Sequence, residues 1–120
     1  MFQDWDSVEK EQVLLILKKV LQLYQDKSKW IDGPIALGNG GMLVEPRSLT
    51  ANKWSLLGAI DKFAYEEFAE LQAGCVACAT RDYLNVISKR DRIWKMCLSY
   101  REEIKIISDA VYKLSNEEQT

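Results

Sequence analysis

The feature that most constrains the fold is a glycine-rich and almost uncharged stretch, KWIDGPIALGNGGMLVEP (residues 29–46), in a chain whose other long segments have the pattern of charged amphipathic helices. Apolar residues lie on both sides of Asn39-Gly40, and a tight two-residue turn between strands needs positive φ at both central positions. The stretch therefore predicts a short β-hairpin with arms at 35–37 and 42–44. Pro34 has no amide hydrogen to donate, so we expect its strand to be an edge or to begin after it.

Apolar residues spaced three and four positions apart predict helices on both sides of the hairpin. The first helix covers about residues 7–27 and opens with a capping box formed by Asp6 and Glu9. The last opens with a second capping box, formed by Ser99 and Glu102, and continues toward the C-terminus.

Two further helices are predicted between these ends. One begins at Ser48 or Thr50 and runs to about Ala73, where Gly74 is well placed as its C-terminal cap. The other covers about residues 76–88.

The segment KRDRIWKMCL (residues 89–98) fits either a continued helix or a short turn that holds Trp94 inward. The sequence thus predicts a mainly α, bundle-like domain of four to five helices with one short β-hairpin between the first and second helices. Residues 1–120 form this single domain, and 115–120 are expected to fray.

The absence of histidine is the most restrictive fact about chemistry. It removes the commonest general base, the imidazole metal ligand, and every Ser-His-Asp or Cys-His arrangement. An enzyme of this sequence would have to rely on Asp, Glu, Lys, Tyr or Cys, and neither a catalytic residue nor a cofactor is assigned.

Charge and hydropathy limit the partners. A net charge of −2 provides no large field of one sign, so binding to duplex nucleic acid is not expected. The longest apolar run in the predicted helices, residues 13–17, is too short to span a bilayer, and the acidic start does not resemble a signal peptide. We therefore expect no membrane partner. The chain has three cysteines, and this odd number argues against a disulfide framework and predicts a cytoplasmic protein.

The glycine stretch and the helix after it resemble an uncharacterised bacterial and bacteriophage domain family of unknown function. The resemblance is carried by the pattern W-x-x-G-x-x-A-x-x-x-x-G-x-x-V followed by A-x-x-W-x-x-x-G-A-I: Trp30, Gly33, Ala36, Gly41, Val44, Ala51, Trp54, Gly58, Ala59 and Ile60. The C-terminal SYREEIKIISDAVYKL is also similar to that family's last helix. Ser55 stands where the family usually has cysteine, and the family's Asn-Asp pair before the last helix is missing. The resemblance implies a fold and an accessory protein that binds a host component, and supplies no catalytic residues.

Three other groups of residues have the composition of a phosphate-binding, metal or dithiol, or acid–base site. The glycine stretch is not a P-loop, because Met42 follows Gly41 where that motif needs lysine. Cys75 and Cys78 have the spacing of a zinc or dithiol site, but they also fit small buried residues of a helix. Asp61, Glu66, Glu67 and Glu70 could act as acid and base if one were desolvated, or form a solvated helix face.

The segment 81–105 holds seven basic and four acidic residues, a net charge of +3. Aromatic rings interleaved with arginine can stack on a nucleotide, although such a run is more often a solvated corner. The binding residues that we assign are Trp30, Lys89, Arg90, Arg92, Trp94 and Lys95, with Trp5 as a further protein contact.

Three hypotheses of function follow. The leading one is a small non-catalytic binding protein, phage-encoded, that inhibits a host protein such as a defence component. The second is a small-molecule or nucleotide-binding protein that uses Trp30 or Trp94 with the basic segment. The third is a small enzyme that uses the carboxylates or the cysteine pair. A homodimer through the apolar stripe of the last helix is left open.

Overall fold

The computed structural model describes residues 8–33, 35–89 and 98–118. These residues form four α-helices and a two-stranded sheet between the first and second helices, which confirms the predicted fold class. The elements are α1 (Lys10–Leu23), the 3₁₀ turn η2 (Lys27–Lys29), β1 (Ala36–Gly38), the 3₁₀ turn η3 (Asn39–Gly41), β2 (Ala51–Trp54), α2 (Leu56–Glu67), α3 (Glu70–Ser88) and α4 (Tyr100–Glu118).

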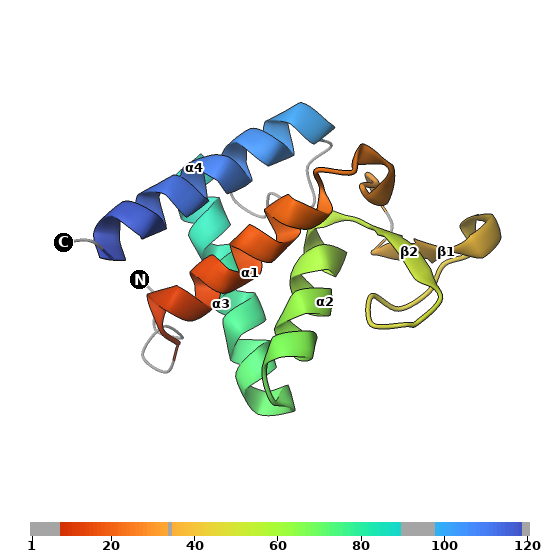
Figure 1. Ribbon diagram of the computed structural model, residues 1–120, viewed down its shortest axis with the longest axis horizontal. Coiled ribbons are helices and arrows are strands. Elements are labelled where there is room, and N and C mark those ends of the chain that lie inside the picture. The colour runs from red at the N-terminus through yellow and green to blue at the C-terminus, as the bar shows by residue number, and fades with distance from the viewer. Residues whose placement is uncertain (1–7, 34, 90–97, 119–120) are drawn as a thin grey trace.

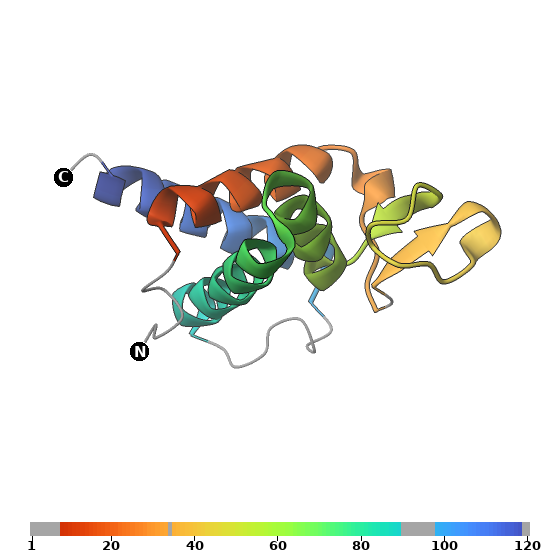
Figure 2. The same ribbon diagram turned by 90° about the horizontal axis from the view of Figure 1, so that it is seen from below.

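The helices form one body, and the sheet projects from it (Figures 1 and 2). In Figure 1, α4 lies along α1 and runs in the opposite direction, while α2 and α3 form a second antiparallel pair. Both views place the sheet at the end of the molecule away from the first turn of α1 and the last turn of α4, beyond the start of α2. We call residues 35–54, which contain β1, η3, the following loop and β2, the arm.

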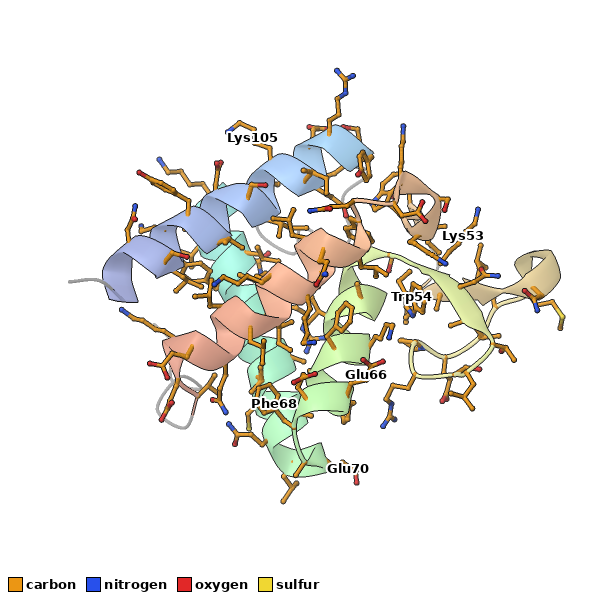
Figure 3. The ribbon with its side chains drawn as sticks, in the orientation of Figure 1. Lys53, Trp54, Glu66, Phe68, Glu70 and Lys105 are labelled. Carbon is orange, nitrogen blue, oxygen red and sulfur yellow. The ribbon has the colours of Figure 1, made fainter. Side chains whose placement is uncertain are left out.

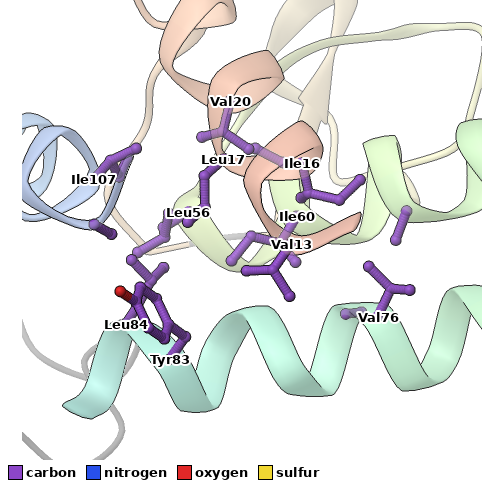
Figure 4. Close-up of a cluster of buried hydrophobic side chains, with 14 of the residues drawn as sticks. Val13, Ile16, Leu17, Val20, Leu56, Ile60, Val76, Tyr83, Leu84 and Ile107 are labelled. Carbon is purple, nitrogen blue, oxygen red and sulfur yellow. The ribbon is translucent and has the colours of Figure 1, made fainter. Parts of the chain in front are cut away.

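The core lies where the inward faces of the four helices meet. In α1 the buried residues recur at three- and four-residue spacing, as an amphipathic helix requires. The side chains that Figure 4 labels in this core are Val13, Ile16, Leu17, Val20, Leu56, Ile60, Val76, Tyr83, Leu84 and Ile107.

The first helix begins later than predicted, with Glu9 as its N-cap. Asp6, the other residue of the predicted capping box, lies outside the described residues. The Glu9 N–H donates to Oε1 of Gln12 at 2.9 Å. The helix ends at Leu23, and the carboxylate of Asp26 then caps η2 by accepting from the Ser28 N–H at 3.0 Å.

The capping box predicted for the last helix is confirmed. The Glu102 N–H donates to Oγ of Ser99 at 3.2 Å, and the Ser99 N–H donates to Oε1 of Glu102 at 3.0 Å. Because α4 continues to Glu118, part of the segment expected to fray is helical, and residues 119–120 lie outside the described ranges.

The second predicted helix is wrong at both ends. Ser55 caps α2, since its Oγ accepts from the Gly58 N–H at 3.3 Å, so the residues before it are free to form β2. The helix then breaks at Phe68, which has extended backbone angles, and α3 begins at Glu70. Gly74, predicted as a cap, lies inside α3.

The sheet pairs β1 with β2 in antiparallel register, with Ala36 opposite Trp54 and Leu37 opposite Lys53. The predicted partner of β1 was 42–44, and this segment instead forms one isolated bridge, between Leu37 and Leu43. The chain does reverse here, but through the 3₁₀ turn Asn39–Gly41, which has three residues between the bonded Gly38 and Met42 and not the two of the predicted turn.

Candidate interaction surface on the arm

The tip of the arm, by which we mean residues 39–50, begins with a left-handed backbone turn that glycine adopts without strain. Gly40 and Gly41 have φ of 73° and 77°, a region that side chains rarely adopt. The reversal is held by two backbone bonds, from the Gly38 N–H to the Met42 carbonyl at 2.8 Å and from the Val44 N–H to the Ala36 carbonyl at 3.2 Å. The turn therefore presents the residues that follow it in an extended conformation beside β1.

Large apolar side chains are exposed on this tip. The exposed fraction is 70% for Met42, 73% for Leu43 and 104% for Leu49. Met42 also lines an apolar hollow of about 260 Å³ together with Gly38, Asn39, Val44 and Thr50, the residue next to Leu49. Single exposed apolar residues are ordinary, and three of them between residues 42 and 49 make this segment the candidate interaction surface.

The base of the arm is fixed to the helical body by backbone and indole hydrogen bonds around Trp54. Its carbonyl accepts from the Tyr24 hydroxyl at 2.9 Å and from the Ile31 N–H at 3.2 Å. Its indole N–H donates to the Pro46 carbonyl at 2.9 Å, which ties the loop after the tip to β2. Figure 3 shows Trp54 at the junction of the arm and α2. The tip is thus carried on a rigid support.

Removal of the Tyr24 hydroxyl tests this support. Tyr24 is fully buried, and burial, followed by the nearby Glu103 carboxylate, raises the pKa of its hydroxyl. We expect Tyr24→Phe to lower the free energy of unfolding by about 1 kcal/mol, because the Trp54 carbonyl keeps only its bond from Ile31. Urea denaturation followed by tryptophan fluorescence measures the change. Tyr112→Phe, on the 71% exposed Tyr112, is the control and should have no effect.

Trp30, which was assigned to ligand binding, lies in a second network at the base of the arm. Its indole N–H donates to Oε1 of Glu103 at 3.1 Å, and its ring meets Tyr100 edge to face at 5.7 Å between centroids. The Tyr100 hydroxyl donates in turn to the Tyr24 carbonyl. The Trp30 N–H therefore joins the segment before the arm, which bridges to Trp54 at the arm's base, to α4.

Glu103 is a buried carboxyl group in this network, with only 6% of the residue exposed. Burial raises its pKa to about 7, the Trp30 hydrogen bond opposes the rise, and the charge of Asp32 adds to it. A pKa of about 7 means that the Glu103 carboxyl gains and loses its proton near neutral pH.

A groove of about 350 Å³ lies between the arm and α2. Its wall carries the guanidinium of Arg47, which lies 4.3 Å from the centroid of the Tyr65 ring, and the carboxylate of Asp61. Burial raises the pKa of Asp61, while the charges of Arg81 and Arg47 oppose this shift. With Glu45, which also lines it, the groove offers two carboxylates and one guanidinium to a polar group of a ligand or partner.

The basic segment is only partly described. Lys89 is exposed and ends α3 in a left-handed conformation with φ of 57°. The other assigned residues of this segment, and the N-terminal tryptophan, lie outside the described ranges: Arg90, Arg92, Trp94, Lys95 and Trp5. Their role as a binding site stays a prediction.

The carboxylates weighed as acid and base do not form one cluster. Glu66 pairs with Lys62, and Glu67 pairs with Lys19 at 3.3 Å. Glu70 belongs to α3, and Figure 3 shows Phe68 between it and Glu66 along the chain.

Cys75 and Cys78 are free, half-buried thiols on α3. Within the described ranges, no group of three or more potential metal ligands is placed to hold an ion. Over the same ranges, no helix combines the length and apolarity needed to cross a bilayer.

Comparison with known proteins adds no relative. No family model matches the chain, and neither a curated protein nor a solved structure matches it. The resemblance to the uncharacterised bacterial and bacteriophage family stays a prediction.

Proposed function

We propose that this chain is a small non-catalytic binding protein that recognises a protein partner with the tip of its arm. The observation that carries the proposal is the exposure of Met42, Leu43 and Leu49 on an element that projects from the helical body (Figure 2). Burial of an exposed Met or Leu side chain against a partner contributes about 1.5–3 kcal/mol to binding, because apolar surface is removed from water. The rigid attachment at Trp54 favours this use, because little conformational entropy is lost when a held surface binds.

The resemblance to a family found in bacteria and phages extends the proposal to a host protein in the cytoplasm. Inhibition of a defence component is the expected effect, because a small chain can block a larger protein by covering its surface. The partner's identity is open to experiment.

The triple variant Met42→Ser, Leu43→Ser and Leu49→Ser tests the proposal. Tagged wild-type protein is used to capture partners from the host, and the captured protein is then purified for titration. We expect the triple variant to bind it at least about tenfold more weakly, because truncation of central apolar contacts removes about 2 kcal/mol or more. The thermal midpoint of the variant should be unchanged, because these side chains contribute little to the core.

The matched control is the pair Leu71→Ser and Tyr112→Ser. These residues are 90% and 71% exposed, but they lie on α3 and α4. Binding that survives in the triple variant, or that is lost in the control, would contradict the proposal.

A small-ligand role is supported by the groove between the arm and α2, since it brings the Arg47 guanidinium and the Asp61 carboxylate together. This site differs from the nucleotide site assigned around Trp30, whose indole N–H is already bonded to Glu103. A thermal-shift screen with zwitterionic metabolites, repeated with Arg47→Ala, distinguishes this role from protein binding.

A further inference from the structure

The segment after the turn has an unpaired strand edge at Leu43. The two hydrogen bonds that join this segment to β1 flank Leu43, since they use the Met42 carbonyl and the Val44 N–H. In such an antiparallel bridge, the N–H and C=O of the central residue point away from the neighbouring strand. Among the described residues, none pairs with either group of Leu43. Unpaired groups of this kind are a template for another strand.

The opposite edge of the same small sheet is covered at Trp54. Trp30 forms a parallel bridge with Trp54, and the Ile31 N–H donates to the Trp54 carbonyl at 3.2 Å. Leu43 lies on the other side of the sheet, and pairing of its edge with the same edge of a second copy about a twofold axis closes at two copies.

We propose that the Leu43 edges of two copies of this chain pair in antiparallel register about a twofold axis. Leu43 then lies opposite Leu43 of the second copy, and each donates its N–H to the other's carbonyl. In this register Met42 lies opposite Val44, and Gly41 lies opposite Glu45. No like charges oppose each other, so the edge is complementary to itself.

Pairing of the edges leaves the side chains available. Side chains stand on the faces of a sheet while the backbone groups lie in its plane, so pairing uses no side chain, and Met42 and Leu43, as consecutive residues, stand on opposite faces. In the dimer each of these faces carries the apolar residue of both copies. Their use by a partner rests on the proposed function, whereas the pairing itself does not.

The test is the association of the purified chain, measured by sedimentation from micromolar to millimolar concentrations. We expect a reversible dimer that Leu43→Pro weakens at least about tenfold, because proline removes the outward N–H in both copies. Met42 has φ of −73° and ψ of 139°, which suits the residue before a proline. Leu43→Ala is the control, because it keeps the N–H and should retain the dimer.

Hydrogen exchange of wild-type protein decides the question even if the proline variant does not fold. The Leu43 amide should become protected as concentration rises, while the exchange of the exposed Leu49 amide serves as the reference. A monomer at millimolar concentration, or a dimer that Leu43→Pro leaves intact, would overturn the proposal. So would protection of the Leu43 amide that requires a different protein, which would assign the edge to that partner. Partner capture by a monomeric chain would leave the proposed function standing.

Discussion

Replacement of Gly58 by alanine is expected to lower the free energy of unfolding by about 3 kcal/mol or more, although the same change stabilises most helix interiors. Gly58 is buried in α2 against the start of the arm. A Cβ at this position would lie 1.9 Å from the carbonyl oxygen of Ile35 and 2.9 Å from its carbonyl carbon. The carbonyl cannot turn away freely, because it accepts from the Ser55 N–H at 3.1 Å. Urea denaturation measures the loss.

Gly74→Ala provides the matched control for this prediction. Gly74 lies inside α3, and its nearest neighbour to an added Cβ would be the Tyr65 hydroxyl at 3.7 Å, an ordinary contact. We expect this variant to gain about 1 kcal/mol, the usual preference for alanine in a helix. If Gly58→Ala instead gains a similar amount, α2 does not contact the arm as described. Tryptophan fluorescence compared with far-UV circular dichroism distinguishes release of the arm, which carries Trp54, from unfolding of the helices.

The sequence predicted the helical class because periodicity and caps are local signals. The stripe of α1 and the Ser99–Glu102 capping box needed no information about the rest of the molecule. A reversal after Gly38 was predicted for the same reason, although the positive φ angles fall on Gly40 and Gly41 and not on Asn39 as the two-residue turn required.

The strand β2 was missed because Trp54 and Leu57 are spaced as on a helix, and the pattern was extended backward through them. Ser55 carried the contrary signal, since a serine that caps α2 places the residue before it outside the helix. The break at Phe68 had no such signal. It has neither glycine nor proline, and the half-buried Phe68 packs against the core, so tertiary packing decides where α2 ends.

The exposed tip and the buried carboxyl were missed for opposite reasons. The sequence predicts residues 42–44 as an arm of a hairpin, and a pattern of residue types does not show whether the apolar side chains of that arm are buried or exposed. Glu103 could have been found, because it precedes Ile107 by four residues and so shares the inward face of α4. An acidic residue on an apolar stripe indicates a buried, perturbed carboxyl group.

Glu103 is expected to make the stability of the chain depend on pH. Its pKa is about 7 in the folded protein and 4.5 as the ordinary value, so the folded state holds this proton more tightly than the unfolded state. Stability from this group is therefore fully present below the ordinary value and is lost as the pH rises through the folded pKa. The groups that face Glu103 are Trp30, Asp32 and Tyr24, and the negative charge of Asp32 reinforces the effect.

Glu103→Gln should remove this loss. Glutamine keeps an oxygen that can accept from the Trp30 N–H, but it carries no charge at any pH. Between about pH 4.5 and about pH 8, the free energy of unfolding of the variant should rise relative to wild type by about 3 kcal/mol. Urea denaturation at several pH values measures this difference, and comparison across pH cancels any constant effect of the amide. Leu71→Ser, on the 90% exposed Leu71, changes no titratable group, so this control should run parallel to wild type. A Glu103→Gln curve that also runs parallel to wild type would show that the carboxyl is ionised without penalty, as it would be if water reached it at the base of the arm.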